Sequence, residues 1–388
     1  MKPFTPYIVA LPMILLTLIG CGNRNWDDIR PAQTFTPGVP VLVGPEDLSS
    51  TFSYYNTSPE SPNGELIAYV KIFTAQNERY DNMRGELWVC ETDLRRHKKV
   101  TDLNSFVTHN GVEAQWVDDH TIAYFDDGMI QVVDLEGQPL IEPIKAFSIG
   151  HGPHENKILY SQVSPQTGLH TIFEYDLSTS QSRMIADAAT FSNIVDQFSS
   201  PRLRPMNDRR IRHLKYSPDG SKIAFRFDVG NDGERDKHVV TMNVNGGDIE
   251  YFGPKPMHFA WFDNSSIMGH DNQVREGLAN DKSARRWSLT GDFIETLTGP
   301  GNHLSATTDR SLYATESWYN IDPVVLRAFK RGEYVSFWED TVSIDGAAVW
   351  ELGNHVNPAF SRDGKRVYYR KSIAPGRSQA YMVVLPDP

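Results

Sequence analysis

Cysteine is scarce in this sequence. Two cysteines among 388 residues exclude a framework of several disulfides and a four-cysteine zinc site. The chain also lacks a basic excess, because 38 Lys+Arg stand against 49 Asp+Glu and give a formal net charge of -11. Without a basic field for phosphates, a general nucleic-acid binder is not expected. A sustained 3.6-residue apolar period, a Gly-rich phosphate loop and a Gly-x-Ser-x-Gly elbow are missing too. An α-helical fold, phosphate-loop nucleotide binding and serine-hydrolase chemistry therefore have no support.

The first residues read as a targeting segment. Lys2 gives a positive start, and an almost unbroken apolar run extends from Ile8 to Ile19. The run is short for a membrane span and ends in Gly20-Cys21, followed by polar residues. This junction resembles the lipobox of bacterial lipoproteins, which implies cleavage before Cys21 and acylation of its sulfur. We therefore expect a signal peptide at 1–20 and a lipidated tether at 21–38.

The rest of the chain, 39–388, repeats one strand pattern. Asp-Gly or Asn-Gly turns precede apolar runs that are rich in β-branched and aromatic residues, which is typical of β-hairpins. The clearest copies span 61–69, 216–225 and 360–369, and weaker copies span 116–124, 154–160, 261–268 and 305–314. Seven copies spaced roughly 50 residues apart predict an all-β, seven-bladed β-propeller of four-stranded antiparallel blades. The last blade lacks one strand, and we expect Val39–Val43 to complete it and close the ring.

The repeats are similar to those of the periplasmic Tol-system propeller. A narrower resemblance lies in the motifs that flank them, found in order at 106–116, 213–218, 257–261, 301–305 and 353–358. In this order they resemble the seven-bladed propeller polysaccharide lyases that act on oligogalacturonate and ulvan. That resemblance implies histidines around the mouth of the ring and, in some members, a divalent metal ion. The sequence departs from it where His238 replaces an arginine, where Asn357 replaces a histidine and where the ulvan-type cysteine is absent.

Candidate site residues follow from the chemistry of a uronate lyase. Such an enzyme must neutralise a carboxylate, remove the proton at C5 and protonate the leaving oxygen at C4. Five histidines open different blades at matched points, namely His109, His213, His258, His303 and His355. The alternative interpretation is that they cap strands or bond backbone carbonyls. We assign the base to His109 or His258, and the carboxylate clamp to Arg212 assisted by Arg235 or Lys237.

The remaining assignments concern substrate and metal. Residues 201–213 are rich in arginine and read as an inserted basic loop, or alternatively as a solvated face. We expect substrate to contact Arg202, Arg204, Arg210, His213 and His238. We expect His303 and His355, with Asn357 or His258 nearby, to hold one divalent ion (Mn, Zn or Ca), and we expect no organic cofactor. The aromatic pairs Tyr54-Tyr55 and Trp318-Tyr319 suit either stacking on sugars or packing between blades.

The sequence thus favours a polysaccharide lyase that cleaves a uronic-acid-containing glycan by β-elimination. The alternative is a non-catalytic, Tol-like propeller lipoprotein that binds a protein or glycan partner, because one fold hosts both functions. We expect a monomer in the cell envelope, lipid-anchored to the membrane, with an anionic polysaccharide as partner and no nucleic acid. If the host is Gram-negative, the residue that follows Cys21 favours the outer membrane.

Overall fold

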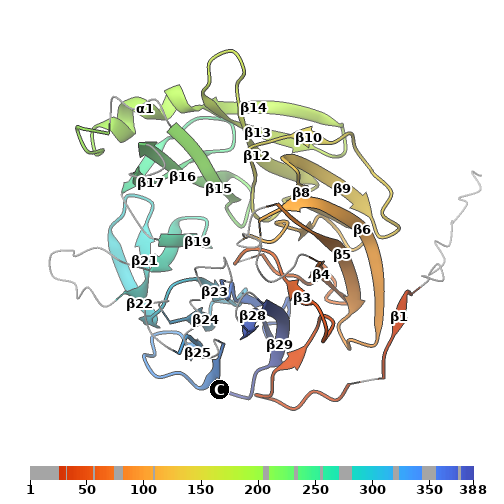
Figure 1. Cartoon of the computed structure of the whole chain (residues 1–388). Helices are drawn as coiled ribbons and strands as arrows, with labels where there is room; N and C mark the ends of the chain where they lie inside the picture. The colour runs from red at the N-terminus through yellow and green to blue at the C-terminus, as the bar shows by residue number, and fades with distance from the viewer. Residues whose placement is uncertain are drawn as a thin grey trace, which may run out of the picture.

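The predicted seven-bladed propeller is confirmed by the computed structural model (Figure 1). Seven antiparallel sheets form a ring, and the first strand of each blade lies nearest the centre. The structure describes residues 26–31, 33–55, 57–73, 82–107, 110–203, 209–230, 235–253, 257–270, 282–317, 323–342, 355–374 and 377–388. His109, Arg204, Cys21 and the pair Trp318-Tyr319 lie outside the described residues.

The first four blades follow one another along the chain, and each is named here from its innermost strand outward. Blade 1 comprises β3 (Ser49–Thr51), β4 (Leu66–Ile72), β5 (Met83–Glu91), β6 (Arg96–Phe106) and β1 (Asp28–Ile29). Blade 2 comprises β7 (Gln115–Trp116), β8 (Thr121–Asp126), β9 (Met129–Asp134) and β10 (Ile144–Lys145). Blade 3 comprises β11 (Ser148–Ile149), β12 (Lys157–Val163), β13 (His170–Asp176) and β14 (Gln181–Asp187). Blade 4 comprises β15 (Arg209–Tyr216), β16 (Lys222–Gly230), β17 (Arg235–Asn243) and β18 (Glu250–Gly253).

The last three blades complete the ring. Blade 5 comprises β19 (Met257–Asp263), β20 (Ser266–His270), β21 (Ser283–Ser288) and β22 (Phe293–Pro300). Blade 6 comprises β23 (Leu304–Ala306), β24 (Leu312–Glu316), β25 (Val325–Lys330) and β26 (Trp338–Thr341). Blade 7 comprises β27 (Ala359–Phe360), β28 (Arg366–Ala374), β29 (Arg377–Val384) and β2 (Val41–Leu42).

The ring closes as the sequence predicts, through the N-terminal strand β2. Val41 pairs with Met382 and Leu42 with Tyr381, so β2 forms the outer strand of blade 7. Beyond the two-residue strand, Val43 N donates to Ala380 O at 2.9 Å and Gly38 N donates to Val384 O at 2.8 Å. The last blade therefore gains a fourth strand from the other end of the chain, and the edge of β29 is paired.

The repeated turns take the conformation that their glycines require. Gly64, Gly220 and Gly364 have φ angles of 73°, 69° and 72°, a region that residues with a Cβ rarely adopt. In blade 4, Ser217 Oγ donates to Asp219 Oδ1 at 2.7 Å, and Ser221 N donates to the same oxygen at 3.0 Å. The Asp-Gly signature of the sequence is thus a tight turn that joins the first two strands of a blade.

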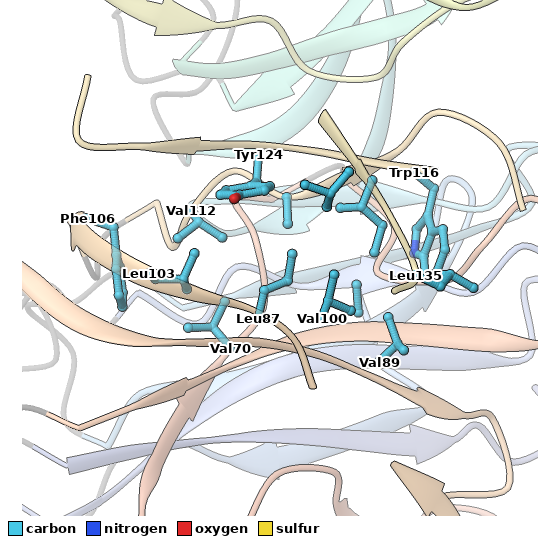
Figure 2. Packing of buried hydrophobic residues seen from close by; sticks show 14 of the residues in the cluster. Val70, Leu87, Val89, Val100, Leu103, Phe106, Val112, Trp116, Tyr124 and Leu135 are labelled. Carbon is cyan, nitrogen blue, oxygen red and sulfur yellow. The ribbon is translucent and has the colours of Figure 1, made fainter. Parts of the chain in front are cut away.

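The core consists of apolar layers between neighbouring blades. Figure 2 shows the layer between blades 1 and 2, where Leu87 and Val89 of β5 face Trp116 of β7 and Tyr124 of β8. Trp116 is further fixed by its indole N–H, which donates to Pro59 O in blade 1 at 2.7 Å. Each such side chain contributes roughly 1.5–3 kcal/mol when it is buried fully. The rigid wall of strands then holds the central loops in place.

One segment differs from the sequence expectation. Residues 201–213 are not a single inserted loop, because β15 begins at Arg209 and carries Arg210 and Arg212 into the sheet of blade 4. The insertion before it includes a helix, α1 (Ala188–Asp196), whose side chains Ala188, Phe191 and Val195 are buried. The physical reason is strand pairing: the backbone of Arg209 to Arg212 pairs with β16 from Val229 to Arg226.

The segment expected to be a tether is partly docked. Within 21–38, Asp28 pairs with His97 and Ile29 with Arg96, so β1 lies along the outer edge of blade 1. Arg30 adds a hydrogen bond from its side chain to Gly44 O at 3.2 Å. Among the described residues, no helix is both long enough and apolar enough to cross a membrane.

Candidate functional site

One position of the innermost strands supplies most of the polar groups at the centre of the ring. Ladder pairs such as Trp116 with Ile122 and Tyr216 with Ile223 fix the register between the first two strands of a blade. In each of these pairs, the residue that comes first in the chain belongs to the innermost part of the blade. In six blades, the residue three positions before it is polar: Thr57, Glu113, His213, His258, His303 or Asn357. The repeat phase that the sequence indicated is therefore confirmed for His213, His258 and His303, but it is wrong for His355, because Asn357 takes this position in blade 7.

Four of these residues have a left-handed backbone. The φ angles are 48° at Glu113, 54° at His213, 52° at His258 and 48° at Asn357. In β15 the ladder register shifts between Arg212 and Lys215, so His213 forms a β-bulge. A bulged residue leaves the regular alternation of its strand, and its side chain can be directed elsewhere. Backbone strain at matched points of separate blades is often found at functional sites.

His258, His303 and His355 form an imidazole cluster. The ring centroids of His258 and His303 are 4.0 Å apart, and those of His303 and His355 are 5.0 Å apart. His303 Nδ1 faces Glu316 Oε1, and both side chains are fully buried. His258 Nδ1 lies 3.2 Å from the backbone oxygen of Asn302. Burial lowers the pKa of His303 well below its usual range, so its imidazole is neutral near pH 7.

Tyr54 and Tyr55 fill the centre of the channel. Tyr55 lies 5.0 Å from the His303 ring and 5.3 Å from the His258 ring. Tyr54 is stacked 5.5 Å from His213 and contacts His151 at the same centroid distance. Both tyrosines are buried, at 2% and 1% exposure. The pair therefore packs among the histidines of several blades, which agrees with the packing interpretation of the sequence rather than with stacking on a sugar.

One cavity lies at a mouth of the channel and has a volume of about 360 Å³. Four of its lining residues bring three kinds of ionisable group together: the guanidinium of Arg212, the carboxyl group of Glu113 and the imidazoles of His151 and His213. The Arg212 guanidinium lies 4.9 Å from the centre of the Phe147 ring, which also lines the cavity. We call this space the first cavity.

The electrostatics of the first cavity favour neutral bases beside a fixed cation. Burial lowers the pKa of both His151 and His213 well below the usual range, and nearby cations such as Lys215 add to the effect. Burial also raises the pKa of Glu113 to about 7, although a hydrogen bond from Asn110 and the charges of Arg212 and Lys215 oppose the rise. The site thus combines proton acceptors, a proton donor and a fixed cation near neutral pH.

A cluster of cations surrounds one buried carboxylate behind Arg212. Asp228 on β16 is 1% exposed, and its carboxylate lies 2.7 Å from Arg226 Nε and 3.7 Å from Arg235 Nη1. The cross-strand neighbours of Asp228 are Arg210 on β15 and Lys237 on β17. The residues predicted to clamp a carboxylate therefore meet in blade 4. Of these, Arg212 lines the first cavity.

A second cavity of about 310 Å³ lies at the opposite mouth of the channel. The β8–β9 turn lines the first cavity, whereas Pro218 of the β15–β16 turn lines the second, and these turns stand at opposite ends of their blades. His151 lines both cavities, and Lys215 lines the second. The two arginines that line the second cavity bond the backbone of the propeller. Arg310 donates to Phe262 O at 3.0 Å, and Arg362 donates to Glu60 O at 3.2 Å.

Besides Arg210, two predicted substrate residues also line neither cavity. His238 on β17 is buried at 1% exposure, with Nε2 3.0 Å from Ser199 Oγ and Nδ1 2.9 Å from Tyr251 Oη. It fixes the segment after α1 and does not line either cavity. Arg202 lies exposed in the turn after α1.

The residues that the sequence reasoning missed are His151, Lys215 and Glu113. His151 opens blade 3 but lacks the repeat motif that marked the other histidines. Lys215 and Glu113 belong to residue types that are usually at the surface. Glu113 could have been found from the sequence, because it lies three residues before Trp116, as His213 does before Tyr216 and His258 before Trp261.

The predicted metal ligands have the right chemical groups to bind a divalent ion, but they are not arranged as a metal site. His303 and His258 each place Nδ1 against an oxygen, an arrangement that leaves Nε2 to ligate a metal. Two nitrogens that share one ion lie at most about 4 Å apart, given metal–nitrogen bonds of about 2 Å, and the ring centroids of this cluster are 4.0 Å and 5.0 Å apart. However, among the described residues no group of three or more His, Cys, Asp or Glu is arranged to hold a metal ion.

Comparison with solved structures finds similar propellers. An oligogalacturonate lyase in complex with manganese matches with a TM-score of 0.62 and 15% identity over 90% of this chain and 93% of that chain. An oligogalacturonate lyase from Vibrio parahaemolyticus matches with a TM-score of 0.64 and 14% identity over 90% and 94%. TolB from Acinetobacter baumannii has a TM-score of 0.41 and 14% identity over 82% and 80%.

These likenesses show the fold. The predicted resemblance to the oligogalacturonate lyases is confirmed at that level, over nearly the whole length of both chains. No family model matches the sequence, and no curated protein does.

Proposed function

We propose that this protein is a polysaccharide lyase that cleaves a uronic-acid-containing polysaccharide or oligosaccharide by β-elimination. The first cavity carries the proposal, because Arg212, two neutral imidazoles and Glu113 line one space of about 360 Å³. That volume falls within the usual range of small-molecule sites. The similarity to two oligogalacturonate lyases supports an anionic oligosaccharide as the substrate class.

The reaction assigns a separate task to each group. The uronate carboxylate binds the guanidinium of Arg212, which stabilises the negative charge that develops as the C5 proton leaves. A neutral imidazole of His151 or His213 takes this proton, since both line the same cavity. His109 and His258 remain hypotheses for the base; His258 lies in the imidazole cluster against Tyr55. Arg210, Arg235 and Lys237 add positive charge behind the clamp.

A divalent ion would be held by His303 and His355, with Asn357 as a further donor. When bound, such an ion would supply positive charge and Lewis acidity beside the imidazole cluster. The oligogalacturonate lyase complex with manganese supports this part of the proposal. Glu316 would orient His303 through Nδ1 and increase its basicity as a ligand.

A non-catalytic binding module is the second candidate. The observation that favours it is the burial of Tyr54 and Tyr55, which occupy the centre of the channel among the histidines. A filled channel suits a rigid binding platform better than a site that must enclose a sugar ring. The two candidates differ in whether substrate is consumed.

A direct assay separates the two candidates. β-Elimination creates an unsaturated uronate, whose ultraviolet absorbance rises as a pectic, ulvan or other glucuronate polymer is cleaved. We expect a continuous rise with at least one polymer in the presence of manganese, and a loss of rate after chelation and dialysis. Binding without any rise in absorbance, across all polymers and metal ions, would support the binding module.

We also propose that the chain is a monomeric lipoprotein of the cell envelope. The support lies in the apolar run that ends at Gly20-Cys21 and in the polar residues after it. A propeller at the end of an acylated segment would meet its glycan outside the cytoplasm. The outer membrane is the proposed site if the host is Gram-negative.

A further inference from the structure

Two carboxylates line the first cavity, and their surroundings differ. Asp127 is exposed in the β8–β9 turn, at the rim. Glu113 is half-buried and stands at the strand position that His213, His258 and His303 occupy in other blades. We propose that Glu113 is a catalytic residue, the general acid that protonates the departing glycosidic oxygen. This inference rests on the lyase activity proposed above.

The backbone conformation and a hydrogen bond from Asn110 fix the position of the Glu113 side chain. Its φ angle of 48° lies in the left-handed region, and the residue stands just before β7, so strand alternation does not set the direction of its side chain. Asn110 Nδ2 donates to Glu113 Oε1 at 2.9 Å. No described residue donates a hydrogen bond to Oε2, which suits a group that must reach a substrate atom.

The surrounding charges make the proton of Glu113 available near neutrality. Burial raises the pKa of its carboxyl group to about 7, while Asn110, Arg212 and Lys215 limit the rise. Lys215 is itself buried, with Nζ 4.5 Å from the Tyr55 ring centre, and burial lowers the pKa of its amine to about 7. Tyr54 also lies within electrostatic range of Glu113. A group with this pKa donates a proton and regains it at the same pH.

The elimination step balances with these residues. The imidazole of His151 or His213 takes the C5 proton, and the C5–H electron pair becomes the C4=C5 double bond. The C4–O4 bond then breaks with its pair on O4, and O4 takes the proton of Glu113. Proton return from the imidazolium to the Glu113 carboxylate, through water in the open cavity, restores the resting state without another reactant. Arg212 holds the uronate carboxylate throughout and neither gains nor loses a proton.

The test compares two leaving groups at O4 in the parent and in Glu113→Gln. With a sugar at O4, the variant should lose about 10²–10⁴ in kcat/KM, since sugar alkoxides need a proton to leave. With a nitrophenyl group at O4, which leaves unprotonated, the loss should be at least about tenfold smaller. The parent rate on the sugar substrate should fall as pH rises through about 7, and this fall should be absent in the variant.

Two further variants keep the test interpretable. Glu113→Asp retains the acid with a shorter reach, so its rate should drop while the fall at high pH remains. Glu155→Gln, an exposed glutamate also at positive φ, should behave as the parent. An unchanged rate in Glu113→Gln, or equal losses on both substrates in a folded variant, would overturn the assignment. A parent without activity on any uronate overturns the lyase proposal itself, and with it this role.

Discussion

Arg212 is the residue on which the proposed chemistry depends most directly. Its guanidinium lies against Phe147 in the first cavity, where a carboxylate can bind it. Arg212→Ala should lower kcat/KM by about 10²–10³, the usual loss for one electrostatic donor, and Arg212→Lys should lose less. The rise in ultraviolet absorbance measures this. Arg95→Ala, at a surface ion pair of blade 1, is the control and should keep the parent rate. Unimpaired cleavage by a folded Arg212→Ala protein would remove the clamp from the mechanism.

His97 makes the protein sensitive to acid without taking part in the site. It is fully buried, Nε2 lies 3.0 Å from Leu94 O and Nδ1 lies 3.0 Å from Tyr69 Oη, which a neutral imidazole satisfies. Burial lowers its pKa to about 4, so the unfolded chain binds a proton below pH 6.5 that the folded chain does not. The free energy of unfolding should therefore fall as pH drops, by about 2 kcal/mol from this group between pH 7 and pH 5.

Urea unfolding at the two pH values, on the parent and on His97→Gln, measures this contribution. The glutamine amide can still donate to Leu94 O but does not titrate, so the variant should lose less stability on acidification. Equal acid sensitivity in parent and variant would mean that other groups account for it. His270, also buried with a pKa lowered to about 4, gives the matched second variant.

At the residue scale, sequence reasoning reached those groups that the repeat marks. His213, His258 and His303 share one strand position, so the spacing of the blades was enough to bring them together. Glu113 and Lys215 escaped because their functional environment comes from burial among residues of other blades. His238 is an error of the opposite kind. Its spacing in the sequence suggested a substrate contact, but its side chain bonds Ser199, in the segment after α1, and Tyr251.

At the element scale, β2 is the strand whose loss should cost most. It provides the outer edge of blade 7, and Val43 beside it is fully buried. A chain that starts at residue 44 should unfold with a free energy several kcal/mol lower than one that starts at residue 33, since pairing and apolar burial are both lost. Denaturant unfolding of the two truncated proteins measures the difference. The chain starting at 33 is the control, because it keeps β2 and lacks the segment on the outside of blade 1 that includes Trp26, β1 and Arg30. Equal stabilities would show that the ring does not depend on this closure.

The strands were more predictable than the helix. Asp-Gly turns followed by β-branched residues recur, so each copy reinforced the others and the number of blades followed. Helix α1 has nine residues, of which three are buried, and so short a segment gives little periodic signal. The strand β15 was hidden by its charged residues: Arg209, Arg210 and Arg212 read as a loop, but their backbone pairs with β16. A run of charged side chains therefore does not exclude a β-strand, because strand pairing involves the backbone and not the side chains.

At the scale of the whole molecule, the ring closes on its inner side as well as its outer side. Glu60 of blade 1 is 1% exposed, and its carboxylate lies 3.1 Å from Arg366 Nη1 and contacts Tyr368 Oη, both in blade 7. Arg362 N adds a hydrogen bond to Glu60 Oε2 at 2.8 Å. The chain ends are thus joined by β2 at the periphery and by a buried carboxylate near the centre. Such double closure ties the last blade to the first at two points.

At the scale of the cell, the proposed membrane attachment depends on Cys21. If Cys21 is acylated after cleavage at Gly20, its chains should hold the propeller at a membrane, since two or more acyl chains anchor a protein stably. Cys21→Ser should then move the protein to the soluble fraction or leave the precursor uncleaved, as membrane fractionation and the mass of the product will show. Cys90→Ser is the matched control, because Cys90 lies fully buried in β5 and cannot be reached by an acyl donor. If the Cys21→Ser protein stays with the membrane in processed form, attachment must come from another part of the protein, and the proposed lipidation of Cys21 would be wrong.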